Sequence, residues 1–522
     1  MLARFGWFFL VTAICLPVAV LTTGVRIPGI DRPAGRPRPA SVPSGDIEMA
    51  WLHTSTNGPT WERFVYGLVR TQMAVPGLTV DDSNAFNETT TAVPEVVFSV
   101  ADRPGKLRIR WYKLTTDATT DHWVNALAER DPAPVAMIGG GSSDRAADLA
   151  RAMNRRKVWA GERPLLFITT ATADELEPGP DDAGDFRAAS QNLIDVYDDL
   201  SFRFCFTNRQ MAEAVIDFTE QNPERLATPS QQAFGGVASA VALHARLSEP
   251  PKVLSVVWKD DPFSTDLHDR FGDALRGKLP RETWEVRYSI GSFATPNFYE
   301  ARTAESILAV CRDNPTRRIL LILPTVTQPA RRLLRALVEG EPRLRDRLVV
   351  VTGDGIPVNA FTRDGQFAWP VHALPVPVVL FTHNDPVGWD APGSTAPPGY
   401  ELRPPNTTEE VLHFARLGRI LVEGVFGLGG TPGVGSPAGS AELCRRLHAR
   451  TPPFFEPSGE RRGGSGEYVV VLRPNPPESG PHGLPEATLD IYRRSTRRGW
   501  EKVNTLDIDQ RRAKPTGPGG RS

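Results

Sequence analysis

The sequence has 522 residues, and its 60 Lys and Arg residues almost balance its 61 Asp and Glu residues, which gives a formal net charge of −1. This balance argues against a strongly basic nucleic-acid binder, and we expect no nucleic-acid partner. With 40% hydrophobic and 23% charged residues, the composition is that of a globular protein long enough for two or three domains. Proline supplies 48 residues, about 9% of the chain against a usual ~5%, and it is clustered.

An apolar segment, Phe5 to Leu21, follows Arg4 at the start of the chain. As a helix it would span about 26 Å, near the lower limit for a bilayer core. An export signal peptide and an uncleaved membrane anchor both fit residues 1–24, and the lack of a convincing small-x-small cleavage site favours the anchor. A Pro-rich spacer follows over residues 25–45, and we expect it to be extended.

The charges beside this segment leave the membrane topology open. The arginines that follow it are Arg26, Arg32, Arg36 and Arg38. By the positive-inside tendency, they would hold the rest of the chain in the cytoplasm, in conflict with export.

From Ile47 onward, short β-type runs alternate with amphipathic helical stretches. The clearest runs are 47–52, 107–112, 134–139, 164–169, 253–258, 318–323, 348–353 and 376–381. Most are continuously apolar, as in strands that helices cover on both faces. The clearest helical stretches are 144–155, 264–277 and 328–337. This alternation predicts a doubly wound α/β architecture, and the length requires two sheets.

Ligands of such sheets bind beyond the carboxyl ends of the strands, so the residues after each run are the candidates for a site. Hydroxyls and carboxylates predominate there. The candidates in chain order are Ser142, Ser143, Thr170, Thr172, Asp260, Asp261, Phe263, Thr325 and Asp354, with Tyr299 as a further aromatic. The sequence shows no nucleophile–base pair, no HExxH and no metal-ligand spacing. We therefore expect no catalytic residue, no metal and no cofactor.

Each candidate also has a purely structural interpretation. The turn Gly140 to Asp144 either binds an anion or carboxylate, or is a glycine-rich turn that a serine caps. The threonines either donate hydroxyls to a ligand or cap the next helix. The acidic residues either pair with a ligand ammonium or stabilise helix starts through the helix dipole. Both aromatic residues either wall a pocket or belong to the core.

Several motifs occur in a characteristic order. A strand, Gly-Pro loop and helix occupy 47–71, a strand, Gly-x-Ser-Ser turn and helix occupy 135–156, and a Ser/Thr-rich strand and turn occupy 164–176. A Phe-Arg strand and a strand-Asp-aromatic-helix unit follow at 202–218 and 253–275, and a closing Phe-x-x-x-Gly strand and ribbon at 453–474 and 489–503. This order resembles the type I periplasmic binding proteins, which include branched-chain amino-acid binding proteins and receptor ligand-binding regions.

The resemblance implies two doubly wound Rossmann-like lobes joined by three hinge crossovers, near 205–208, 382–386 and 452–456. The first lobe would comprise 46–206 and 384–454. The second would comprise 207–383 and 455–503, before a disordered tail at 504–522. Ligand would bind between the lobes, gripped by Ser142, Ser143, Thr170 and Thr172 from the first lobe and, by a looser match, Phe263, Tyr299 and Asp354 from the second.

Three departures from the family pattern bear on the ligand. Phe263 stands where the family often has Tyr, residues 221–251 form a longer stretch than usual, and 387–405 is an insertion. These departures allow a degenerate pocket that binds another ligand or none.

The leading hypothesis is a non-enzymatic solute-binding or sensing protein that faces the periplasm. It would be exported or tethered to the inner membrane by its N-terminal segment, would bind a small polar, amino-acid-like ligand, and would serve an ABC permease or a sensor. One alternative is an enzyme with two Rossmann-like domains, such as a nucleotide-sugar glycosyltransferase. Another is an interaction scaffold that has lost its ligand.

Overall fold

The computed structural model describes a set of ranges that excludes several expected segments. It describes residues 37–87, 89, 92–176, 191–197, 199–222, 251–279, 284–290, 299–362, 369–371, 373–386, 408–428, 437–464, 466–475, 486–496 and 499–508. The expected anchor at 1–24 lies outside these residues, as do the insertion at 387–405 and most of the long stretch at 221–251.

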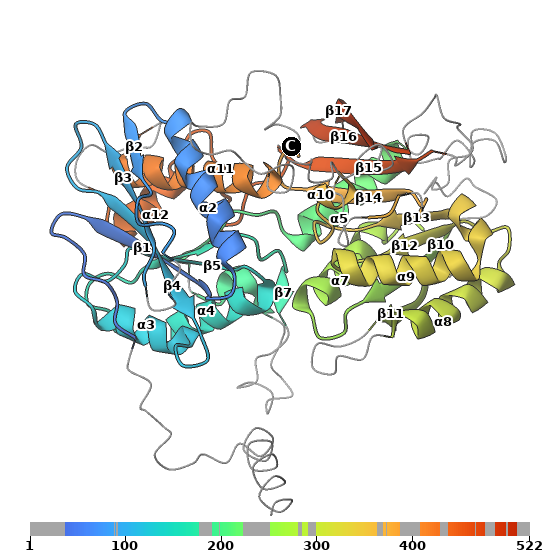
Figure 1. Ribbon diagram of the computed structural model, residues 1–522, viewed down its shortest axis with the longest axis horizontal. Helices are drawn as coiled ribbons and strands as arrows, with labels where there is room; N and C mark the ends of the chain where they lie inside the picture. Colours follow the sequence, from blue (N-terminus) through green and yellow to red (C-terminus); the bar gives the residue numbers. More distant parts are fainter. Residues whose placement is uncertain are drawn as a thin grey trace, which may run out of the picture.

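Two large sheets organise the molecule, and each forms the centre of one lobe (Figure 1). The first sheet has the order β2-β3-β4-β1-β5-β6-β9. Its strands are β1 Ile47–Thr54, β2 Leu78–Asp81, β3 Glu95–Val100, β4 Leu107–Leu114, β5 Ala136–Gly139, β6 Leu165–Ile168 and β9 Ser201–Arg203. The pairs from β4 to β9 are parallel, and β2 and β3 continue the sheet in antiparallel fashion.

The second sheet has the order β11-β10-β12-β13-β14-β15-β16-β17. Its strands are β10 Lys252–Val257, β11 Trp284–Ser289, β12 Ile319–Ile322, β13 Leu348–Val351, β14 Val378–Thr382, β15 Tyr468–Pro474, β16 Ala487–Thr496 and β17 Gly499–Ile508. Pairing is parallel from β11 to β14 and antiparallel from β14 to β17. All eight expected β-type runs therefore form strands, and they make up the parallel interior of the two sheets.

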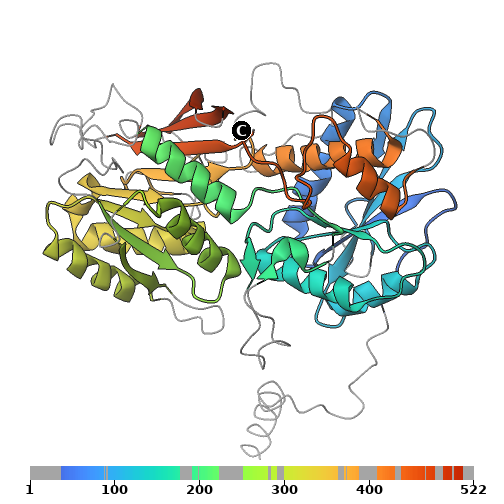
Figure 2. The ribbon, with the colours of Figure 1, turned by 180° about the vertical axis from the view of Figure 1, so that it is seen from behind.

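Helices cover both faces of each sheet (Figure 2). In the first lobe they are α2 Gly58–Arg70, α3 Thr120–Glu129, α4 Ser143–Arg155, α11 Thr408–Phe426 and α12 Ser440–His448. In the second lobe they are α5 Asn208–Gln221, α7 Pro262–Leu275, α8 Glu300–Asp313, α9 Thr327–Gly340 and the short α10 Asn359–Thr362. The three expected helical stretches correspond to α4, α7 and α9.

The pleat of β1 shows how one strand serves two cores. Met49 and Trp51 belong to the core beneath α2 and α11, whereas Ala50 and Leu52 belong to the core beneath α3 and α4. Since successive strand residues point to opposite faces, a continuously apolar strand can be buried on both sides. This explains why these strands lack the polar alternation of a half-exposed sheet.

The chain passes between the lobes first at the end of β9. Phe204 packs in the core of the first lobe, and Phe206, two residues later, packs in a core of the second. The second passage follows β14. Phe381 of β14 packs in a core of the second lobe, whereas the next described helix, α11, packs on α2 of the first lobe.

The third passage lies later than the sequence analysis placed it. Phe455, expected at the crossover, is buried against Phe202 and Phe204 of the first lobe. The loop that follows stays at the first lobe. Phe455 and Arg461 form an isolated antiparallel β-bridge, and the backbone amide of Arg203 donates a hydrogen bond to the carbonyl of Gly459. The apolar Phe-Phe pair resembles the start of a strand in the sequence, but it lies against the edge of the first sheet. The crossing falls between Arg461 and Tyr468.

The expected tail also begins later than residue 504. Strand β17 pairs with β16 up to the Ala487–Ile508 pair, and Ile508 is buried in a core of the second lobe. The polar residues of β17 are exposed, which hides its strand character in the sequence.

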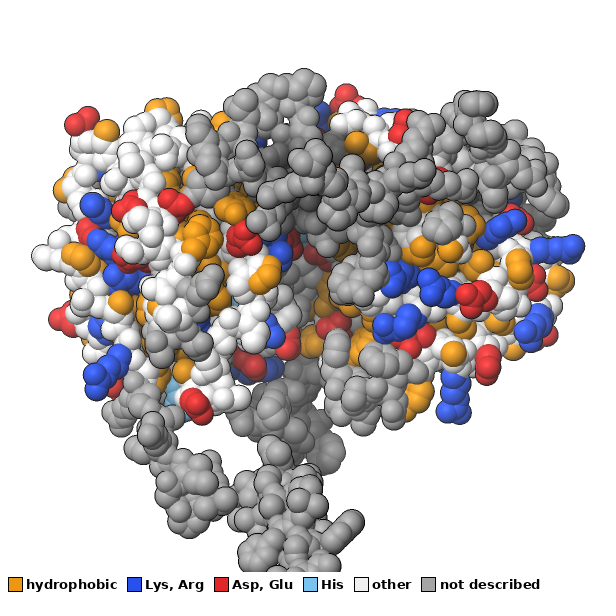
Figure 3. Space-filling model, in the orientation of Figure 1, with side chains coloured by type: hydrophobic (Ala, Val, Ile, Leu, Met, Phe, Trp, Pro, Cys, Tyr) orange, Lys and Arg blue, Asp and Glu red, His pale blue; other side chains and the backbone are white. Residues whose placement is uncertain are grey.

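The end of the Pro-rich spacer is held by the first lobe. Arg110 donates hydrogen bonds to the carbonyls of Ala40 and Ser41, and Arg130 donates a second one to the Ala40 carbonyl. Both arginines also pair with the buried Glu48 of β1. Elsewhere on the surface, acidic and basic side chains are interspersed on both lobes (Figure 3).

Candidate ligand-binding cleft

A cavity of about 780 Å³ lies between the two lobes. Its lining comes from strand ends and helix starts of the first lobe and from the loops after β10, β12, β13 and β14 of the second. Six of the seven predicted site residues line it: Ser142, Ser143, Thr170, Thr172, Phe263 and Asp354. The doubly wound arrangement brings them together because the carboxyl ends of the parallel strands of both sheets point toward the same cleft.

Tyr299 is the exception. It occupies the N-cap position of α8 without a capping side-chain bond among the described residues. Its side chain is 39% exposed, and it is not among the residues that line the cavity. The structure therefore separates Tyr299 from the other six residues.

The glycine-rich turn after β5 sets the shape of the first-lobe wall. Gly140 has φ of +90°, a conformation that favours glycine. A Cβ atom on Gly141 would collide with the imidazole of His53. Ser142 then adopts an extended conformation at the N-cap of α4, and its hydroxyl makes no capping hydrogen bond to the described residues. The N-terminus of α4 therefore lies at the cavity, with Ser142 in its lining.

Two of the predicted hydroxyls hold the loops in place. The Thr170 hydroxyl donates to the Gly140 carbonyl at 2.6 Å, and the Ser143 hydroxyl accepts from the Ala173 amide at 3.2 Å. These bonds join the loop after β5 to the loop after β6. Thr172 is buried beside them, and its carbonyl accepts from the Asn208 amide at 2.7 Å. Ser143 and Thr170 thus combine a structural role with a place in the cavity lining.

His53, at the end of β1, adds a neutral imidazole to this wall. Burial, together with the charge of Arg145, lowers the pKa of His53 to about 4. Its Nδ1 accepts from the Thr54 amide at 2.9 Å, and its Nε2 lies 3.3 Å from Asn57 Nδ2. The ring is held by its own strand end and by the start of α2.

The second-lobe wall begins with the loop after β10. Asp261 caps α7 by accepting from the Phe263 amide at 3.3 Å. Burial raises the pKa of Asp261 to about 6, and Asp144 from the other lobe contributes in the same direction. A Cβ atom on Gly355 would press on the Phe263 ring. The capping role and the cavity-lining role of this loop therefore coexist.

Asp354 is oriented by a histidine at the second crossover. His383 Nε2 lies 2.8 Å from Asp354 Oδ2, and His383 Nδ1 accepts from the Phe206 amide at 3.2 Å. With Nδ1 occupied as an acceptor, Nε2 carries the proton and donates it to Asp354. The carboxylate is thus anchored by one oxygen at the floor of the cleft.

The start of α11 completes the floor with a carboxyl group and a second histidine. Burial raises the pKa of Glu409 to about 8, and its Oε1 accepts from the His383 amide at 2.8 Å. His413 donates from Nε2 to the Thr169 carbonyl at 2.9 Å. Burial holds the pKa of His413 well below its ordinary value. Its Nδ1 is buried without a hydrogen-bond partner among the described residues, so the ring is fixed by Nε2 alone.

The charged groups around the cavity are mostly acidic. Within the described residues, its lining contains six carboxyl groups and one guanidinium: Asp144, Asp260, Asp261, Asp354, Glu409, Glu410 and Arg145. Glu410 pairs with Arg63, which lies outside the lining. Glu409, with its raised pKa, is mostly protonated at neutral pH. The four aspartates still outnumber Arg145, so the cleft presents an excess of acceptors and negative charge.

Four further residues of the lining are not among the predicted site residues: His53, His383, Glu409 and His413. His383 lies two residues after the expected run 376–381, so the strand-end rule that nominated Asp354 applies to it as well. His53 follows the run 47–52 in the same way. Glu409 and His413 carry no such signal, because they lie on a helix that returns to the first lobe and reaches the cleft only through the tertiary fold.

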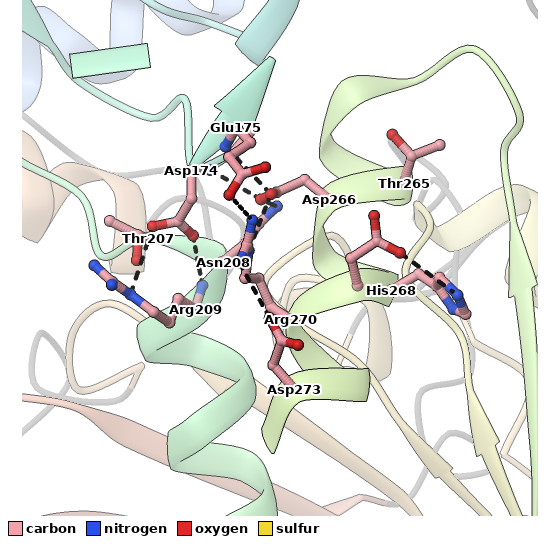
Figure 4. Close-up of polar contacts among 12 residues, drawn as sticks. Asp174, Glu175, Thr207, Asn208, Arg209, Thr265, Asp266, His268, Arg270 and Asp273 are labelled. Atoms are coloured by element: carbon pink, nitrogen blue, oxygen red, sulfur yellow. Dashed lines mark hydrogen bonds and ion pairs between the residues drawn. The ribbon is translucent and has the colours of Figure 1, made fainter. Parts of the chain in front are cut away.

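Beside the cleft, the lobes contact each other through Asp266 of α7 (Figure 4). Its carboxylate accepts from the amides of Asp174 and Glu175 in the first lobe, at 2.8 and 3.2 Å. It also accepts from Asn208 Nδ2 at 2.8 Å. Arg270, one turn later, pairs with Asp266 and with Glu175. Asp266 is 5% exposed, so this contact is a buried polar clasp between the lobes, called the interlobe clasp below.

Comparison with known proteins identifies the fold. No family model and no curated protein matches the chain. Among solved structures, the chain is similar to a leucine-, isoleucine-, valine-, threonine- and alanine-binding protein from Brucella ovis in its closed conformation. The TM-score is 0.50 at 12% identity, over 88% of this chain and 95% of that chain. The chain has the type I periplasmic binding fold.

Two further solved structures illustrate the range of proteins found. A branched chain amino acid ABC transporter periplasmic ligand-binding protein from Burkholderia xenovorans gives a TM-score of 0.45 at 12% identity, over 89% of this chain and 96% of that chain. A solute binding protein from R. palustris in complex with benzoate gives a TM-score of 0.44 at 13% identity, over 89% of this chain and 97% of that chain.

The expected fold class, with two doubly wound lobes, is thus confirmed. In this type I periplasmic binding fold, the cavity lies between the lobes. Across the ranges that the structure describes, no helix is long and apolar enough to cross a membrane. The same ranges hold no group of three or more His, Cys, Asp or Glu side chains arranged to bind a metal ion.

Proposed function

We propose that this protein is a non-enzymatic solute-binding protein whose cleft holds a small polar, amino-acid-like molecule with an ammonium group. The observation that carries the proposal is the acidic lining of the cleft, with six carboxyl groups and one guanidinium among the described residues. Such a lining favours a positively charged group on the ligand.

The second-lobe wall and the floor offer the acceptors for that group. Asp354 keeps one carboxylate oxygen outside its bond to His383. Asp260 and Asp261, in the loop after β10, add carboxylate oxygens to the same lining.

The first-lobe wall offers a place for a carboxylate. The N-terminus of α4 presents unpaired N–H groups, and the Ser142 hydroxyl and Arg145 lie at the same end of the helix. A helix N-terminus stabilises an anion through its dipole and its N–H groups. A zwitterion would thus meet donors on one lobe and acceptors on the other.

The competing hypotheses fit the cleft less well. The diphosphate of a nucleotide sugar would be repelled by the carboxyl groups of the lining. An interaction scaffold that has lost its ligand would be expected to fill its cleft with side chains. The cavity of about 780 Å³ instead falls within the size range of small-molecule sites, roughly 300–1,000 Å³.

A ligand screen tests the proposal. Thermal unfolding of the full chain is followed with the common L-amino acids, with the amines obtained by removing their carboxylate, and with the acids obtained by removing their amino group. We expect amino acids to raise Tm most and carboxylates without an amine to raise it least. A nucleotide sugar that binds more tightly than every amine and amino acid would overturn the proposal, and so would a panel without any stabilising compound.

The location and the partner remain part of the same proposal. Residues 5–21 would export the chain or anchor it in the inner membrane, and the folded lobes would deliver solute to an ABC permease or report it to a sensor. A reporter enzyme fused after residue 45, active only in the periplasm or only in the cytoplasm, tests the side of the membrane. Activity of the cytoplasmic reporter alone would contradict it.

A further inference from the structure

A second cavity, of about 380 Å³, adjoins the hinge, because Arg461 in its lining donates to the carbonyl of the cleft residue His383. We call it the hinge pocket, and it is lined by the five arginines Arg416, Arg419, Arg450, Arg461 and Arg462, together with Pro452, Pro453, Phe454, Ile420 and Gly466. Among the described residues, its lining contains no Asp or Glu. This composition is the reverse of that of the cleft.

The carboxylates nearby do not neutralise the five guanidinium groups. Arg419 and Arg450 share one carboxylate, that of Glu423. Arg462 pairs with Glu456 at 3.3 Å, in an exposed contact. Glu467 attracts Arg461, but its carboxylate pairs with Arg494. Arg416 and Arg461 therefore have no ion pair of their own among the described residues.

Arg461 is buried at the point where the crossover segments meet. It is 2% exposed, and its guanidinium stacks on the Phe206 ring at 3.6 Å from the centroid. It donates to the carbonyls of Phe204 and His383 at 3.3 and 3.4 Å. Neutral carbonyls and an aromatic ring hold the side chain in place but do not cancel its charge.

Arg416 lies beside it on α11. It makes no hydrogen bond or ion pair with another described residue, and a Cβ atom on Gly466 would lie 3.6 Å from both Arg416 Nη1 and Arg461 Nη2. The two guanidinium groups therefore flank one small region of the pocket. Burial, and the charge of Arg416, hold the pKa of Arg461 well below its ordinary value. Two positive charges placed this close together repel each other.

We propose that the hinge pocket is an anion site, in which Arg416 and Arg461 hold a small oxyanion with two or more negative charges, such as a phosphate group. Guanidinium groups match the geometry of phosphate oxygens through paired N–H donors. An anion between them would replace like-charge repulsion with attraction. Arg450 and Arg462, with Arg419, complete the rim and attract the anion from solution.

The position of this site links it to the movement of the lobes. Arg461 contacts the first and second crossover segments through Phe204 and His383, and it precedes the third crossing itself. Arg416 belongs to the first lobe through α11. An anion bound by both arginines ties the crossover segments to one lobe and stiffens the hinge. This inference does not depend on which solute the cleft binds.

The test is a titration of the full chain with inorganic phosphate at constant ionic strength, with sodium chloride as the balancing salt. We expect saturable binding in calorimetry and a rise in Tm beyond that in chloride alone. Arg416→Gln should weaken phosphate binding at least tenfold. Arg343→Gln changes an exposed arginine on η5 Pro342–Asp346, far in the sequence from the pocket, and should leave phosphate binding unchanged.

A cleft variant separates this site from the cleft. Ser143→Ala alters the first-lobe wall and should leave phosphate binding unchanged. Arg416→Gln should fold, because it removes one of two close like charges, and its Tm in chloride should equal or exceed that of the wild type. Arg462→Gln, at the exposed rim, gives a second measurement in which phosphate affinity falls.

Three outcomes overturn the proposal. One is the lack of saturable phosphate binding above the chloride background. Another is equal phosphate affinity in Arg416→Gln and the wild type. The third is loss of phosphate binding in Ser143→Ala with retention in Arg416→Gln, which would place the anion in the cleft.

Discussion

The two cavities of this protein both adjoin the hinge residue His383, and their linings differ in charge. Among the described residues, the cleft is lined by six carboxyl groups and one arginine, and the hinge pocket by five arginines and no carboxyl group. The partition between them is thin, since Arg461 of the hinge pocket donates to the carbonyl of His383 while the His383 ring donates to Asp354 in the cleft. The contrast shows that one hinge can carry two sites with different ligand chemistry.

The largest expected effect comes from the interlobe clasp. Asp266→Ala removes a buried carboxylate that accepts from the Asp174 and Glu175 amides and from Asn208. Because these donors become unpaired and Arg270 loses a partner, we expect the free energy of unfolding to fall by about 2–4 kcal/mol. Chemical denaturation measures the change.

The same variant sharpens the comparison between the cavities. It should weaken ligand binding in the cleft, which needs both lobes, and leave phosphate binding in the hinge pocket unchanged. Asp269→Ala, an exposed carboxylate on the same helix, is the matched control and should change stability by under about 0.5 kcal/mol. Equal losses in the two variants would show that the clasp contributes nothing beyond an ordinary surface charge.

The second prediction removes one negative charge from the cleft. Asp354→Asn keeps an oxygen that can accept from His383 Nε2, so the local geometry should persist. Loss of a charged hydrogen bond to a ligand ammonium costs about 1.5–3 kcal/mol, and we expect affinity for the best ligand of the screen to fall about 10- to 100-fold. Calorimetry measures it, with Asp313→Asn on the exposed end of α8 as control. Unchanged affinity would remove Asp354 from the site.

The third prediction concerns Glu409 and pH. Its folded-state pKa of about 8 lies above its ordinary value of 4.5, so between these values the native state binds more protons than the unfolded state. The stabilisation is fully present below about pH 4.5 and is lost as pH rises toward 8. Between pH 5 and 8, the wild type should lose about 1–3 kcal/mol more stability than Glu409→Gln. Parallel stability curves for the two proteins would contradict the buried, protonated carboxyl.

The smallest expected effect is at the rim of the hinge pocket. Arg462 is half exposed and pairs with Glu456 at 3.3 Å, and exposed ion pairs contribute about 0–1 kcal/mol. Arg462→Gln should therefore weaken phosphate binding only about two- to threefold, and should leave the cleft ligand unaffected. A larger loss than in Arg416→Gln would move the centre of the anion site to the rim.

The sequence was most informative where burial is complete. Strands such as β12 and β13 are apolar on both faces, so they were predicted together with their place in a parallel sheet. Strand β2 was missed, because it is a four-residue strand at a sheet edge with partly exposed polar residues. The first half of β17 lies in the predicted ribbon at 489–503, but its last residues, 504–508, fall in the predicted tail because most of their side chains are polar and exposed.

The site residues that could be predicted from the sequence are likewise those next to buried strands. Ser142, Thr170 and Asp354 follow strands directly, and the strand-end rule alone nominates them. Tyr299 was nominated by resemblance without a strand end, and the fold places it away from the cavity. Glu409 and Arg416 could not be predicted from the sequence, because α11 reaches the cleft and the hinge pocket only after the chain has returned from the second lobe.

The attachment of the spacer to the first lobe has a mechanical consequence. Ala40 and Ser41 are bonded to Arg110 and Arg130 of that lobe, whereas Ile508 is buried in the second. In the proposed anchored form, a tether upstream of residue 37 would hold the first lobe as the base, and the second lobe would be the part that moves. A fluorophore on the exposed Asp507 of β17 should then travel relative to the attachment point when the proposed cleft opens or closes.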